Sequence, residues 1–331
     1  ARAPPPPMAT PFTRTTTRVS ASLVFNNLTC NSTDLAYAHG NAAVLVPNGA
    51  TSAIGTSVVP VIIDTHSPVS QVRFLQPPLS PKPILAVLTH KHGLLYSADG
   101  TQCLHTVALP KSLPLGSYMR GVCACKVGDT SFIFLGTSGN GDLICLDAIS
   151  LRSEKEYPNL CTGAVSDLDG SDGGVLAAAA ASNAVNGMSE VVIMRVGPNG
   201  MPTVSARLPE EAPGLCTSLR ILDGSLYCAY STGHVRLFDL STQMCTTVIT
   251  AHARWINALE VNQSKGLFAC AAEDGHVSVW RALGGGKVEH HKYLSLEDSQ
   301  MTGVAFVGAT SGSLVAATAY DYDAVVVWST N

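Results

Sequence analysis

The sequence predicts an all-β chain that folds as a single seven-bladed β-propeller, and three observations support this fold class. Short runs that alternate apolar and polar residues recur along the chain, bounded by Gly, Asn, Asp and Ser, whereas helical periodicity is nearly absent. The runs group into units of roughly 40 to 50 residues, a period typical of four-stranded propeller blades. Seven such units occupy the 331 residues and leave none for a second domain.

The clearest unit lies near the C-terminus and contains two strands, a tight turn and a third strand. Residues 256–261 alternate in polarity and are predicted as its first strand. Residues 267–272 form the second strand, 273–275 (Glu-Asp-Gly) the turn, and 276–280 the third strand. The other six units are compared with this template.

The remaining units repeat the second and third strands of the template. Their paired runs are residues 35–37 and 44–46, 84–88 and 94–96, 132–136 and 143–147, 175–182 and 191–194, 226–230 and 234–239, and 314–317 and 325–328. Alignment of the third strands on a bulky residue gives separations of 51, 50, 48, 44, 42 and 48 residues between Leu45, Tyr96, Leu146, Met194, Phe238, Trp280 and Trp328. This regular spacing predicts seven blades, with a six-bladed or irregular ring as the alternative.

The seventh unit reaches the end of the sequence without a fourth strand, and the N-terminal region supplies a candidate. Residues 15–20 are rich in β-branched side chains and precede the first unit. We expect this segment to pair beside the last blade, because that pairing closes the ring and removes an exposed sheet edge. Residues 1–14 contain a run of four prolines and are predicted as a disordered extension, so the propeller is expected to span residues 15–331.

The composition limits the classes of function. Charged residues make up 13% of the chain, apolar residues 46%, and the net charge is −4. This balance lacks the basic field of a nucleic-acid-binding protein, and the longest apolar runs are too short to cross a bilayer. Because no secretory signal is visible, we expect a cytoplasmic protein. The low fraction of charged residues fits either a subunit partly covered by partners or a surface rich in uncharged polar residues.

Candidate metal-binding and catalytic residues are sparse. The ten cysteines include no CxxC pair, which predicts buried free thiols and no metal or cofactor. Residues 167–174 carry alternating oxygen-bearing side chains like a calcium loop, but they lack a distal Glu, so a polar turn between two strands is expected. No catalytic motif appears, which favours a non-enzymatic protein. A hydrolase or metal-dependent site assembled from scattered loops at the central channel is the alternative.

Three residues of the template unit resemble the structural tetrad of the WD-repeat family: His252, Asp274 and Trp280. The resemblance implies that the inter-blade His bonds to the turn Asp and, through a Ser or Thr, to the Trp indole. Cys270 or Ala272 stands where that hydroxyl is expected, so the tetrad is predicted to be incomplete. The first four blades lack a clear tetrad, although His66 occupies the same inter-blade place.

The order of the segments also resembles the family of WD repeat-containing protein 54, over roughly residues 15–330. The segments that carry this resemblance are residues 136–147, 249–254, 272–280 and 319–321. The resemblance implies a scaffold for protein–protein interactions in a larger assembly, tied to the cilium or axoneme and to microtubules. The alternative is a soluble cytosolic adaptor, such as a substrate receptor of a ubiquitin ligase.

Arg254 and Trp255 are the first candidates for partner binding, because they follow the inter-blade His and belong to residue types that dominate binding hot spots. Trp255 could equally pack between blades. Four further residues are expected on the same or a neighbouring part of the surface: Arg120, Met301, Tyr320 and Asp321. The predicted partners are other proteins, among them axonemal or microtubule-associated proteins, and neither nucleic acid nor membrane.

Overall fold

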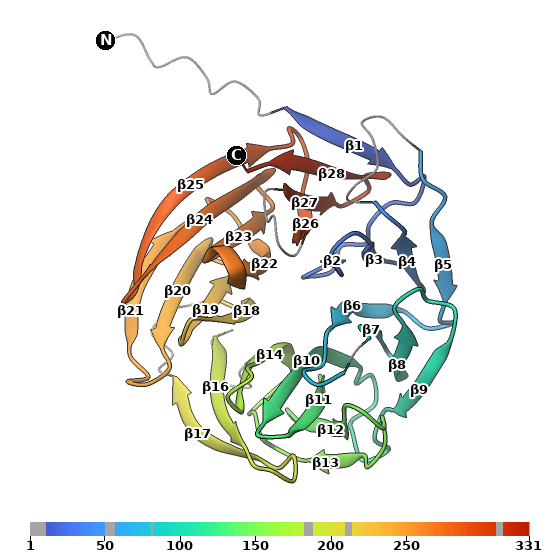
Figure 1. The fold of residues 1–331 in the computed structure, drawn as a ribbon, viewed down its shortest axis with the longest axis vertical. Coiled ribbons are helices and arrows are strands. Elements are labelled where there is room, and N and C mark those ends of the chain that lie inside the picture. The colour runs from blue at the N-terminus through green and yellow to red at the C-terminus, as the bar shows by residue number, and fades with distance from the viewer. Residues whose placement is uncertain are drawn as a thin grey trace.

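Seven four-stranded antiparallel sheets surround a central channel, with one strand of each sheet at the channel and one at the rim (Figure 1). The computed structural model describes residues 11–49, 57–80, 82–181, 188–208, 214–308 and 314–330. In these residues the only helical element is a single 3₁₀ turn, η1 (Gln263–Lys265). The predicted seven-bladed β-propeller is therefore confirmed.

Blades one to six each take four consecutive strands, from the channel to the rim. The first three blades contain β2 (Thr29–Cys30), β3 (Leu35–His39), β4 (Ala42–Val46) and β5 (Val61–Asp64); β6 (Val69–Leu75), β7 (Ile84–Thr89), β8 (His92–Ser97) and β9 (Cys103–Ala108); and β10 (Met119–Val127), β11 (Thr130–Thr137), β12 (Leu143–Asp147) and β13 (Lys155–Tyr157). The next three contain β14 (Val165–Gly170), β15 (Val175–Ala181), β16 (Ser189–Val196) and β17 (Pro202–Leu208); β18 (Cys216–Leu222), β19 (Ser225–Tyr230), β20 (His234–Asp239) and β21 (Cys245–Thr250); and β22 (Ile256–Asn262), β23 (Leu267–Ala272), β24 (His276–Gly284) and β25 (Lys287–Ser295).

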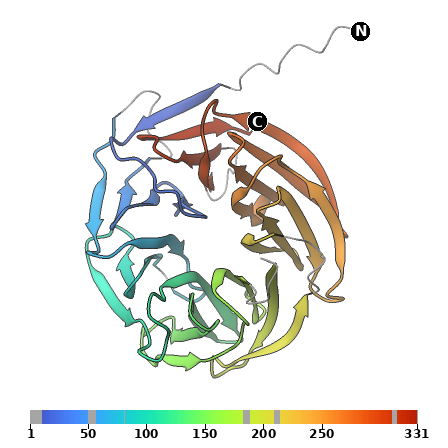
Figure 2. The ribbon, with the colours of Figure 1, turned by 180° about the vertical axis from the view of Figure 1, so that it is seen from behind.

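Blade seven joins the two ends of the sequence. It contains β26 (Met301–Val307), β27 (Leu314–Ala319), β28 (Ala324–Ser329) and, at the rim, β1 (Phe12–Thr16). β1 runs antiparallel to β28, with Phe12 opposite Trp328 and Thr16 opposite Ala324, and both views of the ring show the two strands side by side (Figures 1 and 2). The N-terminal closing strand is confirmed. It begins before residue 15, so Phe12, Thr13 and Arg14 belong to the sheet rather than to the predicted extension, whose residues 1–10 lie outside the described residues.

The core lies between neighbouring blades, where apolar side chains of adjacent sheets pack on one another. Between blades six and seven, for example, Val279, Met301 and Trp328 are all fully buried in one cluster. The ten cysteines are free thiols, seven of them buried, and burial raises the pKa of Cys145 to about 12. Cys103 is exposed, unlike the buried thiol that the sequence predicts.

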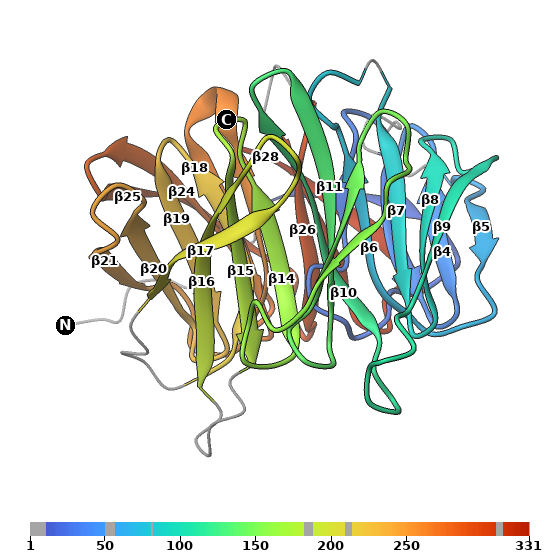
Figure 3. The same cartoon turned by 90° about the horizontal axis from the view of Figure 1, so that it is seen from below.

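Seen from the side, the ring has two faces that carry the connections between strands (Figure 3). All the inner strands start on one face, and the turns between second and third strands lie on that same face because each blade is an antiparallel meander. The segment between β1 and β2, residues 17–28, also lies there. We call this segment the strap and this side of the ring the strap face.

Candidate functional site: the strap face at blades six and seven

Blade six carries a hydrogen-bonded tetrad. His252 Nδ1 lies 3.1 Å from both carboxylate oxygens of Asp274, and its Nε2 lies 2.8 Å from Ser278 Oγ. Trp280 Nε1 donates to the same hydroxyl at 3.0 Å. The indole can only donate and the Asp274 carboxylate can only accept, so Ser278 Oγ accepts from Trp280 and His252 Nδ1 donates to Asp274. The four side chains therefore satisfy one another.

The tetrad is complete, which corrects the prediction that its hydroxyl is missing. The sequence comparison placed the hydroxyl on the second strand, at Cys270 or Ala272, but Ser278 supplies it from the third strand, two residues before Trp280. Burial alone would raise the pKa of Asp274, but the hydrogen bonds from His252 and Ala253 and the electrostatic influence of His252 and His276 together outweigh it, so the pKa lies below its ordinary value. Asp274 therefore stays ionised and fixes the turn.

His66 does not take part in an equivalent tetrad. It lies between β5 and β6, as predicted, but its side chain is 86% exposed and contacts Asp64, also at the surface. A His between two blades therefore does not by itself indicate a buried network. It predicts a tetrad only when the same blade also has an Asp in its turn and a Trp on its third strand.

A second polar system joins the blades around the channel. Each inner strand from blade two to blade seven has a register shift after its first residue, and the bulged residue is polar. Five of these side chains donate to a carbonyl at the start of the next blade: Ser70 to Met119, Arg120 to Ser166, Ser166 to Cys216, Thr217 to Ile256, and Asn257 to Met301. We call this series the inner belt.

The strap completes the inner belt between blades seven and one. Asn27 N donates to Thr302 O at 2.9 Å, and Thr318 Oγ1 donates to Asn27 O at 2.8 Å. Asn26 reaches further across the channel, where its Nδ2 donates to Thr217 O and to Asp167. The strap therefore lies over the mouth of the channel and contacts inner strands on its far side.

Arg120 belongs to the inner belt, which corrects its assignment to a binding surface. The residue is only 7% exposed, and its guanidinium donates to the carbonyls of Ser166, Ser70 and Phe25 at 2.9, 2.9 and 3.1 Å. Burial lowers the pKa of Arg120 despite the nearby Asp167. Met301, the second such candidate, is fully buried between blades six and seven. Neither side chain is available to a partner.

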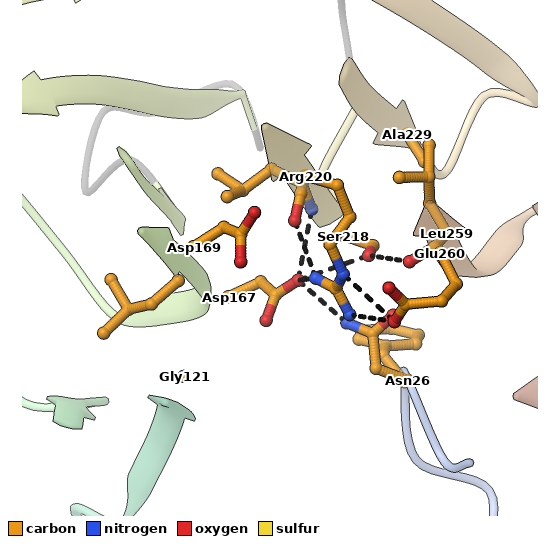
Figure 4. A network of polar contacts seen from close by, with 12 residues as sticks. Asn26, Gly121, Asp167, Asp169, Ser218, Arg220, Ala229, Leu259 and Glu260 are labelled. Carbon is orange, nitrogen blue, oxygen red and sulfur yellow. Dashed lines mark hydrogen bonds and ion pairs between the residues drawn. The ribbon is translucent and has the colours of Figure 1, made fainter. Parts of the chain in front are cut away.

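Beneath the strap, a largely buried ionic network lies in the channel (Figure 4). Arg220 donates to Asp167 at 2.7 Å and to Glu260 at 3.2 Å, which links blades four, five and six. Arg73 of blade two bonds to Asp169 at 2.9 Å. Burial alone would raise the pKa of Asp167, but the guanidinium groups of Arg220 and Arg73 outweigh it and hold the pKa low. For Asp169 burial dominates and the pKa is raised.

These carboxylates correct the interpretation of residues 167–174 as a polar turn. Asp167 and Asp169 lie on the inner strand β14 and face the channel, and the turn begins only after Gly170. Over the described part of the chain, no group of three or more His, Cys, Asp or Glu side chains could hold a metal ion. The same residues include no helix with the length and apolar character needed to span a membrane.

The other four candidates are at the surface. Trp255 is 43% exposed and Tyr320 50%, and Arg254 and Asp321 are exposed. Trp255 stands against Phe25 of the strap, with ring centroids 6.1 Å apart. It therefore does not pack between blades. Phe25 was missed by the sequence reasoning, because nothing in the sequence places the strap beside blade six.

Comparison with known proteins agrees with this architecture. The family model described as WDR54 matches residues 25–330. The chain is 28% identical over 264 residues to WD repeat-containing protein 54 of Mus musculus, covering 75% of each chain. It is also 28% identical over 264 residues to WD repeat domain 54 of Rattus norvegicus, covering 72% of each.

A solved structure extends the likeness of fold to the whole ring. One chain of the structure titled "Crystal Structure of Mitotic Checkpoint Complex" superposes with a TM-score of 0.72. The match covers 100% of this chain and 99% of that one at 14% sequence identity. At this identity the likeness concerns the fold alone.

Proposed function

Because the chain belongs to the WDR54 family of WD-repeat proteins, we propose that it is a non-enzymatic scaffold that binds other proteins through the strap face at blades six and seven. The observation that carries the proposal is Trp255, a large aromatic side chain left half-exposed beside Phe25 and the exposed Arg254. Trp and Arg contribute most of the binding energy in many interfaces.

The rigidity of the surroundings supports this proposal. Asp274 accepts hydrogen bonds from the backbone N–H groups of Ala253 and His276, so the tetrad fixes the residue next to Arg254. Trp255 O accepts from Glu273 N at 2.9 Å. A partner that docks here meets a preformed surface, which lowers the entropic cost of association.

Affinity capture with cross-linking on the full chain tests the proposal. We expect Trp255→Ala to reduce the recovery of specific partners at least tenfold, roughly the 1.4 kcal/mol or more that a hot-spot truncation costs. Ile149→Ala, which removes an exposed apolar side chain on the opposite face, is the matched control and should leave recovery unchanged. Equal recovery with both variants contradicts a binding role for this face.

We further propose that the assembly is ciliary, axonemal or microtubule-associated and that the protein acts in the cytoplasm. Support comes from the resemblance to the family of WD repeat-containing protein 54. A soluble adaptor, such as a ubiquitin-ligase substrate receptor, is the competing proposal. Cell fractionation separates the two: retention with microtubules after detergent extraction favours the first, and co-purification with ligase subunits in the soluble fraction favours the second.

A further inference from the structure

The exposed candidates belong to one continuous surface at the junction of blades six and seven. Trp255 contacts Phe25 of the strap, and Trp255 O accepts from Glu273 N. On the other side, Tyr320 N donates to Gln300 O at 2.8 Å. Asp321 N approaches Ala21 O at 3.4 Å, which brings the surface back to the strap. The ring contact and the backbone hydrogen bonds thus join the strap, blade six and blade seven at this surface.

A recess of about 340 Å³ lies in this region and is lined by Arg254, Glu273, Asp274, Asp298, Ser299 and Gln300. Its walls are held close together. Gly275, in the turn of blade six, has a positive φ of 79°, and a Cβ there would lie 2.9 Å from Leu296 O and 3.2 Å from Ser299 O. The turn therefore packs directly against the segment that leads into blade seven, and the recess is a fixed feature of the junction.

The charge of the recess is unbalanced. Three carboxylates face a single guanidinium, and Asp274 already accepts a hydrogen bond from His252. Within the described residues, Glu273, Asp298 and Arg254 form no ion pair. An additional cation would offset carboxylate charge that the protein itself leaves uncompensated.

We propose that this recess accepts the Lys or Arg side chain of a linear segment of a protein partner, while a neighbouring apolar side chain of that segment packs on Trp255 and Phe25. The inference rests on the proposed function and adds the chemistry of the partner. An indole half-exposed beside a carboxylate-lined recess offers an apolar anchor and a cation site a few residues apart. An acidic segment bound to Arg254 is the opposite outcome.

Two synthetic peptide libraries test this chemistry on the full chain. Both contain 12-residue peptides with an apolar residue near a central position, which is Lys or Arg in one library and Glu in the other. We expect the protein to select from the basic library, and we expect binding of the selected peptides to weaken as salt is raised. Selection from the acidic library, or from neither, overturns the proposal.

Charge reversal at an exposed wall residue gives the decisive variant. Asp298→Lys should weaken the selected basic peptides at least tenfold, whereas Asp172→Lys, the same change at an exposed position on the opposite face, should leave binding unchanged. Melting curves confirm that both variants fold. If Trp255→Ala abolishes capture of partners but Asp298→Lys affects neither peptides nor partners, the proposed function stands and this inference fails. If neither variant affects capture, both fail.

Discussion

The tetrad of blade six and the inner belt use similar polar side chains in different structural roles. The tetrad ties the residues before blade six to the turn and third strand of that same blade, through His252, Asp274, Ser278 and Trp280. The inner belt instead joins successive blades from two to seven, with one polar side chain at each of these five junctions. One system stabilises a single turn, and the other closes the ring.

This difference explains how a propeller with degenerate repeats stays closed. His66 shows that an inter-blade His can be left exposed at the surface without opening the ring. At the channel, by contrast, buried carbonyls at five successive junctions each accept from a belt side chain. We infer that tetrads are dispensable blade by blade, whereas loss of a belt donor is costly at its junction.

The largest expected effect is at Arg120, where the belt and the strap meet. Arg120→Met keeps the apolar stem but removes the donors to the carbonyls of Ser166, Ser70 and Phe25. We expect the free energy of unfolding to fall by about 3 kcal/mol, because several buried acceptors lose their partner. Urea denaturation measures it. Arg254→Met, the same change at an exposed position, should cost under about 0.5 kcal/mol, and equal losses would refute a structural role for Arg120.

A smaller loss is expected in the tetrad. Ser278→Ala removes the hydroxyl shared by His252 and Trp280 and leaves the buried His252 Nε2 and the partly buried Trp280 Nε1 without this partner. We expect a decrease of about 2 kcal/mol in the free energy of unfolding, less than for Arg120→Met, because the damage stays within one blade. Ser112→Ala, in an exposed loop, is the control. A loss in Ser278→Ala that exceeds that of Arg120→Met would reverse the proposed ranking of tetrad and belt.

Sequence reasoning found the blades because strand periodicity is a local property. It also selected His252, Asp274 and Trp280, whose spacing along the chain is characteristic. It missed Ser278, because a hydroxyl on the third strand reaches the same point in space as one on the second. Such an equivalence depends on how side chains project from the sheet.

The positions of the inner-belt residues form a regular pattern in the sequence, which the sequence reasoning overlooked. Its bulge residues recur at intervals of 40 to 51 positions, at Ser70, Arg120, Ser166, Thr217, Asn257 and Thr302. A polar residue at the same place in successive inner strands predicts a shared role. The misassignment of Arg120 as a binding residue arose from the expectation that the residue before or at a strand start is exposed. Contacts that the strap makes across the ring could not be predicted, because they join residues 95 to 306 positions apart.

The smallest expected effect concerns pH and separates the tetrad from the rest of the molecule. The pKa of Asp274 is lowered in the folded protein, so its contribution is fully present above its pKa in the unfolded chain and is lost as pH falls through the folded value. Asp274→Asn should therefore cost up to about 1 kcal/mol at pH 7 and close to nothing at pH 2 to 3. Urea midpoints of the wild type and the variant at both pH values measure the two differences.

Protonation of Asp167, whose pKa is also lowered, weakens both proteins alike and cancels in that comparison. Asp172→Asn, an exposed change on the opposite face, should show no difference at either pH. A gap between wild type and Asp274→Asn that widens on acidification would mean that the carboxylate of the tetrad is not what holds the turn.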